Sequence, residues 1–272
     1  MKTKFFSFLL SIFFLNSTIP LFSQKPIAVL IVGYQEETTA SSIDQADDIA
    51  SLLLQNNFKI HKFYDEDANW ESIKKILPEA SIVLYDGHGT HLGLDGEFGG
   101  LAISNFISGQ KIVDDIHFTH KPLILFQSVC GGAGGSAGDD DDIGFQEAMN
   151  RSHDSFLPFY LAGAAGYIAN NYVGGIYKNL LELFDGKSLE DSFGPHTLWT
   201  DKEETKLGFE KHPTYLHKTY SSKGGGIATR TTYINGKKHV TKITSPRDYD
   251  ICFIGDPNFT IEILLSEALS KN

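Results

Sequence analysis

Two residues with the chemistry of a base and a nucleophile follow apolar runs, and each precedes glycine. His88 ends the run Ser81-Ile-Val-Leu-Tyr-Asp-Gly-His88 and is followed by Gly89. Cys130 ends a second apolar run and is followed by two glycines. A cysteine attacks carbonyls as its thiolate. Histidine titrates near neutral pH, so it can take the thiol proton and later protonate a leaving amine. The pair therefore predicts a dyad for nucleophilic catalysis.

The elements that must position this pair read as buried strands. Ile27–Val32, Ser81–Tyr85 and Leu123–Phe126 are continuous apolar runs, which is typical of strands buried on both faces of a parallel sheet. Helical patterns alternate with them, so the sequence predicts an α/β fold with a mostly parallel central sheet. Sites in such sheets lie at the carboxyl ends of the strands. If the strands before His88 and Cys130 are neighbours, both side chains emerge at one edge.

Helix signals between the strands are more local. Ser42 with Gln45 resembles a capping box at a helix start. The residues expected on one apolar face of that helix are Ile43, Ala46, Ala50, Leu53 and Leu54. Further along, 143–149 reads as a helix start, and 156–168 reads as a short helix followed by a strand.

The polar stretch 186–245 is expected to be an insertion. Thr229–Ile234 and Lys237–Ile243 flank Asn235-Gly236, which is the strongest short hairpin signal. We interpret this stretch as an inserted β-hairpin that is not part of the sheet. Ile251–Ile254 reads as the last sheet strand, and residues 25–272 are expected to form one domain.

The first 24 residues resemble a secretory signal peptide. Lys2 and Lys4 precede the apolar run Phe5–Phe14 and a small-residue region. A membrane anchor is the alternative, but the apolar run is short for a span. We expect a secreted or periplasmic protein with no stable membrane insertion after the signal peptide is removed. The net charge of −11 disfavours nucleic acid as a partner.

The two cysteines could form a disulfide, as an exported protein allows. Against this, Cys252 lies inside the apolar run Ile251–Ile254 and reads as an inert core residue, whereas Cys130 begins a glycine-rich loop. We therefore expect both thiols to be free.

Several stretches together resemble the caspase-like (clan CD) cysteine peptidases, and the chain is most similar to the gingipain family. The matching stretches are Tyr85–Gly89, Ser128–Gly131, Phe145–Ala148, Leu161–Ile168 and Phe253–Pro257. The resemblance covers roughly residues 26 to 265 and leaves 186–245 unmatched. It implies a caspase-like three-layer sandwich that cleaves peptide bonds in protein or peptide substrates.

Within that resemblance, His88 is the general base and acid and Cys130 is the nucleophile. The backbone N–H groups of Gly89 and Cys130 could form the oxyanion hole for the tetrahedral intermediate. Ser128, two residues before the nucleophile, departs from relatives that carry an acid there. The acidic charge and the family suggest cleavage after arginine or lysine. Arg151 or the segment 202–223 would suit self-cleavage.

An acidic run follows the glycine-rich loop and could serve the site. Asp139 and Asp140 are candidate substrate-binding residues within Asp139–Asp142. The same run could hold a structural calcium ion, or it could be a solvated loop. No cofactor is required for the dyad, and the sequence identifies no metal ligands with certainty.

Three alternatives remain open at this point. Ser136 lies in a Gly-x-Ser-x-Gly pattern, but that motif needs a strand-to-helix turn, and aspartates follow here. His88 and His91 with Asp86 and Asp95 could be a metal cluster of a metal-dependent hydrolase. The third alternative is a catalytically silent caspase-like module that binds a partner or assists secretion.

Overall fold

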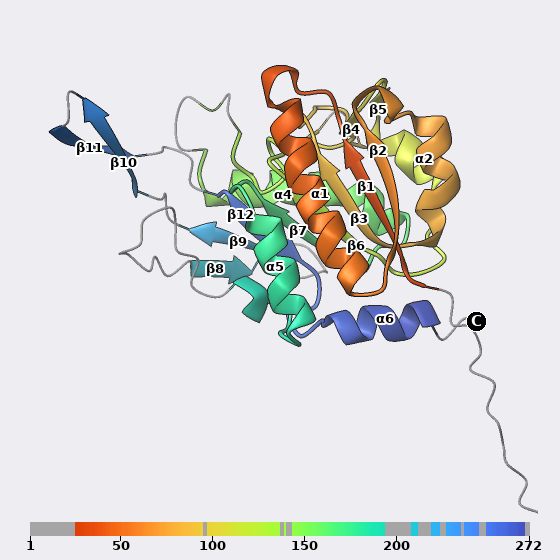
Figure 1. Cartoon of the computed structure of the whole chain (residues 1–272). Helices are drawn as coiled ribbons and strands as arrows, with labels where there is room; N and C mark the ends of the chain where they lie inside the picture. Colours follow the sequence, from red (N-terminus) through yellow and green to blue (C-terminus); the bar gives the residue numbers. More distant parts are fainter. Residues whose placement is uncertain are drawn as a thin grey trace, which may run out of the picture.

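The computed structural model of the chain is built around an eight-stranded sheet in the order β2-β1-β3-β6-β7-β12-β9-β8. It describes residues 25–94, 97–136, 139, 143–193, 208–211, 219–223, 227–234, 237–244 and 249–269. The predicted signal peptide and Asp140 lie outside these residues. Helices pack on both faces of the sheet (Figure 1).

The part of the sheet that carries the predicted dyad is parallel. Its five parallel strands are β1 (Ile27–Val32), β2 (Lys59–Tyr64), β3 (Ala80–Asp86), β6 (Leu123–Gln127) and β7 (Gly166–Asn170). The α/β class and the mostly parallel central sheet are therefore confirmed. Every residue of β3, β6 and β7 is buried, as expected for strands covered on both faces.

Three antiparallel strands extend the sheet beyond β7. They are β12 (Ile251–Ile254), β9 (Thr219–Lys223) and β8 (Gly208–Lys211). The sequence did not predict β8 and β9 as sheet strands, because they lie in the polar stretch 186–245. Outside the sheet, β10 (Ile227–Ile234) and β11 (Lys237–Thr244) pair with each other antiparallel.

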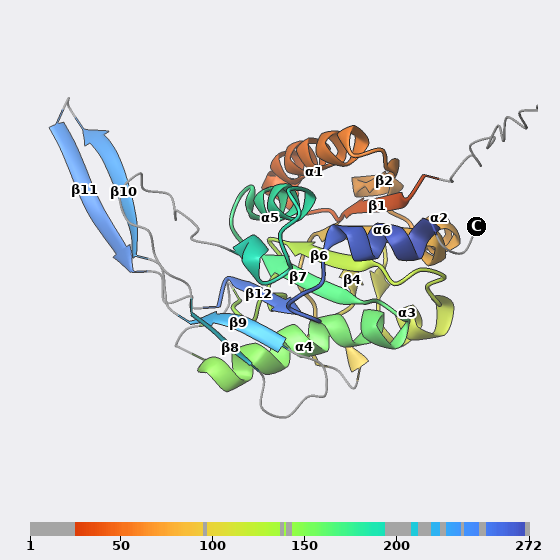
Figure 2. The same cartoon turned by 90° about the horizontal axis from the view of Figure 1, so that it is seen from below.

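Two hydrophobic cores sandwich the sheet, as the view from below shows (Figure 2). One core packs α1 (Thr39–Gln55), α5 (Gly175–Phe184) and α6 (Ile261–Leu269) on one face. The other packs α2 (Trp70–Ile76), α3 (Gly109–Asp115) and α4 (Phe145–Leu161) on the opposite face. Side chains alternate along each strand, so one strand contributes to both cores. The arrangement has three layers.

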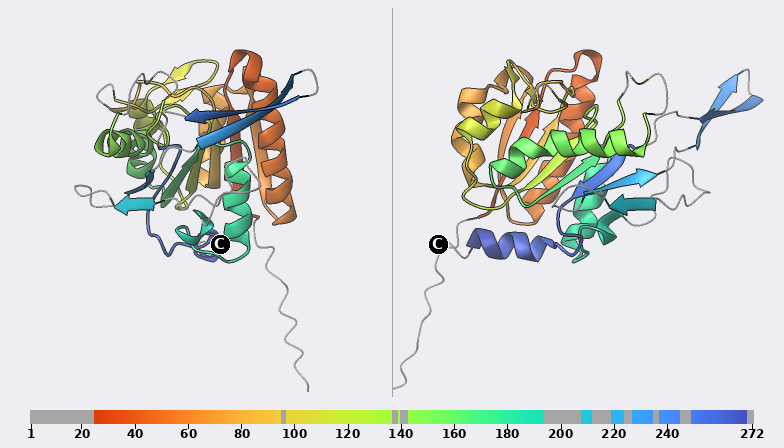
Figure 3. Two further views of the ribbon diagram at one scale, coloured as in Figure 1. Left: turned by 90° about the vertical axis from the view of Figure 1, so that its left-hand side faces the viewer. Right: turned by 180° about the vertical axis from the view of Figure 1, so that it is seen from behind.

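Short elements after β3 form a small lobe over the carboxyl edge of the sheet. β4 (Leu101–Ala102) and β5 (Phe106–Ile107) pair antiparallel. The views from the side and from behind place this lobe beside the ends of β1 and β3 (Figure 3).

The structure corrects three sequence expectations about helices. Ser42 lies inside α1, whose N-cap is Thr38, so the predicted capping box is wrong. Leu54 is 57% exposed, so its predicted place on the apolar face is wrong, whereas Leu53 is buried as predicted and Leu52 is buried as well. The predicted helix start at 143–149 and the short helix after 156 are one continuous helix, α4, with Pro158 inside it.

Candidate active site

The predicted dyad residues emerge from neighbouring parallel strands. Asp86, the last residue of β3, is the register partner of Gln127, the last residue of β6. His88 follows two residues after β3, and Cys130 follows three residues after β6. Both residues therefore lie at the carboxyl edge of the sheet, the edge at which open α/β sheets place their sites.

The backbone brings the two segments into direct contact at Gly89. A Cβ atom on Gly89 would overlap the Cys130 carbonyl oxygen and would lie 2.6 Å from its carbonyl carbon. Only glycine fits this approach without displacing one segment. The residue after the predicted base therefore packs against the backbone of the predicted nucleophile.

Tyr85 fixes the segment that carries His88. Its buried hydroxyl donates to the His88 carbonyl at 2.9 Å and accepts from the Ala102 N–H at 2.9 Å. Burial is the main cause that raises the pKa of Tyr85 above its ordinary value, so it remains a neutral donor. The tyrosine thus ties the end of β3 to the lobe formed by β4 and β5.

Side chains from strands β7 and β12 hold the turn after Cys130. The Gly132 carbonyl accepts hydrogen bonds from the Tyr167 hydroxyl at 2.8 Å and from the Cys252 thiol at 3.6 Å. Burial raises the pKa of Cys252 to about 12, so this thiol is a donor and not a nucleophile. Sequence reasoning assigned Cys252 to the core correctly, but it gave no sign of this contact with the turn.

Two backbone donors beside the dyad are uncommitted. Within the described part of the chain, neither the Gly89 N–H nor the Cys130 N–H donates a hydrogen bond. The next two N–H groups are used inside the turn, from Gly131 to the Gly135 carbonyl at 2.8 Å and from Gly132 to the Val129 carbonyl at 2.9 Å. The two donors that the sequence predicted for an oxyanion hole are therefore both free to donate.

The reactive side chains themselves are accessible. His88 is exposed, and Cys130 is partly exposed and free. The His88 ring makes no hydrogen bond within the residues that the structure describes. Catalytic hydrogen bonds are often long or absent before substrate binds, so an unpaired imidazole at this edge is compatible with a base that engages a substrate complex.

A buried carboxylate lies directly beneath the dyad, and the sequence pattern did not identify its role. Asp86 has no solvent exposure and accepts from Gln35 Nε2 at 2.9 Å, Ser42 Oγ at 3.1 Å and Gln127 Nε2 at 2.8 Å. Burial, opposed by these hydrogen bonds, raises the pKa of Asp86. The cluster joins the loop after β1, helix α1 and the ends of β3 and β6.

The candidate substrate-binding acid Asp139 is already engaged. Its carboxylate accepts from Arg151 Nη1 at 2.8 and 3.0 Å and from the Ser136 N–H at 2.7 Å. Arg151 lies inside α4 with its side chain 14% exposed. Self-cleavage after Arg151 would need an extended peptide bond at that residue, and in the folded chain this bond is helical.

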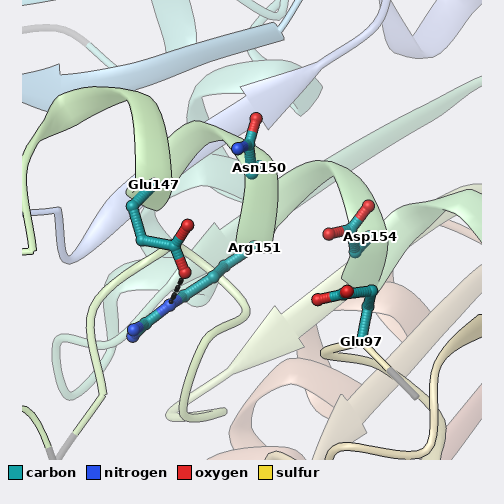
Figure 4. A pocket seen from close by; sticks show the side chains of 5 residues that line it. All are labelled: Glu97, Glu147, Asn150, Arg151 and Asp154. Carbon is teal, nitrogen blue, oxygen red and sulfur yellow. Dashed lines mark hydrogen bonds and ion pairs between the residues drawn. The ribbon is translucent and has the colours of Figure 1, made fainter. Parts of the chain in front are cut away.

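A polar pocket of about 390 Å³ lies beside this ion pair. Its lining comes from α4 and from the loop after His88 (Figure 4). The lining residues are Glu97, Glu147, Asn150, Arg151 and Asp154.

The described residues contain no group of three or more histidine, cysteine, aspartate or glutamate side chains that could hold a metal ion. Asp95 of the proposed metal cluster lies outside them, and the His91 ring packs on Phe98 at 4.0 Å between centroids. Both cysteines are free, so the disulfide is not formed. Among the same residues, no helix is long and apolar enough to span a membrane.

Comparison with known proteins adds no relative: no protein-family profile matches the chain, and no curated protein matches it.

Proposed function

We propose that the chain is an exported cysteine endopeptidase of caspase-like fold that uses His88 and Cys130. The observation that carries this proposal is the packing of Gly89 against Cys130 at the ends of adjacent parallel strands. It puts a base, a thiol and two free N–H donors at one edge. The three-layer arrangement and the motif order that resembles the gingipain family support the same assignment.

The reaction follows from the chemistry of these groups. His88 takes the proton from the Cys130 thiol, and the thiolate attacks the carbonyl carbon of the scissile peptide bond. The carbonyl oxygen becomes an oxyanion, to which the N–H groups of Gly89 and Cys130 donate. His88 then gives its proton to the leaving amine. Water attacks the acyl-enzyme with His88 as base, which releases the second product and restores the thiol.

The proposed peptidase has three further features: an inserted hairpin, export from the cytoplasm and a preference for cationic substrates. The β10–β11 pair is an inserted hairpin that the peptidase fold does not need. Removal of residues 1–24 would deliver the mature protein to the cell exterior or the periplasm. Cleavage after arginine or lysine fits the acidic net charge of −11, since a cationic substrate is attracted to an acidic protein.

Hydrolysis of fluorogenic peptides tests the proposal directly. Wild-type protein should cleave members of a library that varies the residue before the cut. Cys130→Ala should abolish the activity, and His88→Ala should lower kcat/KM by roughly 10²- to 10⁴-fold, the usual contribution of a general base. His117→Ala is the matched control, because His117 is an exposed histidine between α3 and β6.

Three results would contradict the proposal. Full activity in Cys130→Ala would exclude this cysteine as the nucleophile. A folded, reduced wild-type protein that cleaves no peptide and is not labelled at Cys130 by a thiol-directed peptide inhibitor would favour a binding module. Loss of activity with a chelator together with insensitivity to thiol reagents would favour a metal-dependent hydrolase.

A further inference from the structure

Arg151 makes more contacts with the site's loops than its position on a helix suggests. It lies on α4, and its Nε donates to Glu147 on the same helix at 2.8 Å. Its Nη1 donates to both oxygens of Asp139 and lies 3.5 Å from the Gly134 carbonyl. Gly134 and Asp139 belong to the loop that begins at Cys130. One side of the guanidinium is therefore bound to that loop.

The same guanidinium also contacts the loop that follows His88. Its central carbon lies 4.8 Å from the centroid of the Phe98 ring. Phe98 in turn packs closely over Gly131, where an added Cβ would lie 2.6 Å from the ring atom Cε1. An arginine can stack on an aromatic face while its edge donates to a carboxylate, which lysine cannot do. Arg151 thus touches segments that extend from both dyad residues.

The loop after Cys130 is rich in glycine and is held by several contacts from other elements, of which Arg151 supplies one. Gly131 and Gly134 adopt positive φ values of +75° and +112°, and glycine-rich backbone has many alternative conformations. The start of the loop is held by Tyr167 and Cys252 at the Gly132 carbonyl and by Ser155 of α4 at the Gly131 carbonyl, the last at 3.4 Å. Arg151 adds a second contact with α4, at Asp139 further along the loop.

We propose that Arg151 is a positioning residue that holds the loops after His88 and Cys130 in the geometry of the dyad, with Asp139 as its partner on the nucleophile's loop. The inference rests on the proposed function and gives Asp139 a structural role in place of substrate binding. Orienting groups of this kind matter because a displacement of about 1 Å at a reacting centre can lower a rate by roughly 10²-fold.

The two carboxylates that pair with Arg151 come from different segments, and Figure 4 shows the pair with Glu147. Glu147 and Asp139 both neutralise Arg151, but Glu147 is one helical turn away on α4, whereas Asp139 is on the loop. If the Asp139 contact is removed, Glu147 still compensates the guanidinium, which faces a polar pocket. Loss of Asp139 should therefore release the loop without unfolding the helix.

The experiment compares Asp139→Asn with Glu147→Gln. Both substitutions replace one carboxylate that faces the same arginine by a neutral amide, and only the first weakens a contact with the loop. Arg151→Met and Arg151→Lys complete the series, and circular dichroism checks that each variant is folded. Two quantities are measured: kcat and KM on a cleaved peptide, and the second-order rate of Cys130 alkylation by iodoacetamide between pH 5 and 9, located by mass spectrometry.

We expect Asp139→Asn and Arg151→Met to lower kcat by roughly tenfold or more with a smaller change in KM, and to alter the pH profile of alkylation. Glu147→Gln should stay within about threefold of wild type, because it leaves the loop contact intact. Arg151→Lys should recover only part of the loss. The double variant Asp139→Asn/Arg151→Met should be no worse than Arg151→Met alone, since the Asp139 contact is already lost there.

Equal effects of folded Asp139→Asn and Glu147→Gln on kcat and on alkylation would overturn the inference, since a purely structural ion pair predicts that result. Failure of the proposed function gives a different result, namely a wild-type protein without turnover on any peptide. The alkylation series needs no substrate, so in that case it still decides whether Arg151 and Asp139 position Cys130.

Discussion

At the scale of single residues, the buried carboxylate of Asp86 has an unusual environment. It lies two residues before His88, and the three side chains that donate to it are all neutral. Burial raises its pKa, so the folded state holds the proton more tightly than the unfolded chain does. Next to it, Gln127 Oε1 is buried and has no hydrogen-bond partner. The cluster is therefore better matched to a neutral group than to an anion.

Replacing Asp86 with asparagine should make stability less sensitive to pH. Wild type loses stability as pH rises from about 3.9, the unfolded pKa, through the raised pKa of the folded state. Asparagine does not titrate. If the Gln127 amide turns so that its Oε1 faces residue 86, the asparagine amide can donate to that oxygen. The stability of Asp86→Asn relative to wild type should therefore increase with pH, by about 1.4 kcal/mol per unit of pKa shift.

Urea unfolding at several pH values between 4 and 7 measures this difference. Asp48→Asn on the exposed face of α1 is the control for the loss of one carboxylate. A difference between Asp86→Asn and wild type that stays constant across the range would contradict the prediction. Asp86→Ala should instead be destabilising at every pH, by about 2–4 kcal/mol, because the buried donors Ser42 and Gln127 and the half-buried Gln35 lose their acceptor.

At the scale of elements, the sequence predicted the strands better than the helices. Ile27–Val32 matches β1 to the residue, because a strand buried on both faces must be apolar throughout. Ser42 was read as a cap, yet its hydroxyl donates to Asp86, 44 positions away in the chain. A local pattern cannot distinguish these two uses of one serine. The sequence did not show that β3 and β6 are neighbours. The prediction that His88 and Cys130 lie at one edge depended on that adjacency, which the structure has.

The contacts that a sequence cannot show are those between distant loops. Asp139 forms an ion pair with Arg151, although its segment of glycines and aspartates has no periodicity that would predict the contact. Phe98 packs on Gly131 from a different loop. Likewise, β8 and β9 lie in a polar stretch, and only their pairing beside β12 makes them part of the sheet. Neither strand has the continuous apolar run that marks the central ones.

Gly89→Ala tests the close approach of the two strand ends. The added methyl group would overlap the Cys130 backbone, so the segments after β3 and β6 must separate. We expect a stability loss of about 1–3 kcal/mol from the forced shift and a fall in kcat/KM of roughly 10²-fold. Peptide hydrolysis and thermal unfolding measure the two effects.

The control for this variant is Gly186→Ala. Gly186 has φ +86° and no heavy atom within 4 Å of an added Cβ, so alanine there costs about 1 kcal/mol of backbone strain and no overlap. This variant should keep the wild-type kcat/KM. If Gly89→Ala lowers kcat/KM no more than Gly186→Ala does, the packing of Gly89 on Cys130 is not needed for catalysis.

At the scale of the whole molecule, the chain divides into a layered body and a separate ribbon. The eight-stranded sheet and its helices form the body, whereas β10 and β11, among the described residues, pair as strands only with each other. Figures 1 and 3 show the ribbon apart from the helices that cover the sheet. A two-stranded ribbon of this kind contributes little to the stability of a body that it does not join.

Excision of the ribbon should therefore leave the body folded. Ile227 and Thr244 are cross-strand partners, so their Cα atoms are about 5 Å apart, and a Gly-Ser bridge can replace residues 227–244 without strain. We expect the midpoint of thermal unfolding to change by less than about 4 °C and peptide cleavage to persist.

Deleting residues 208–223 is the matched control, because it removes β8 and β9 and exposes the edge of β12. That variant should be clearly less stable. A ribbon deletion as damaging as the loss of β8 and β9 would show that the ribbon belongs to the body.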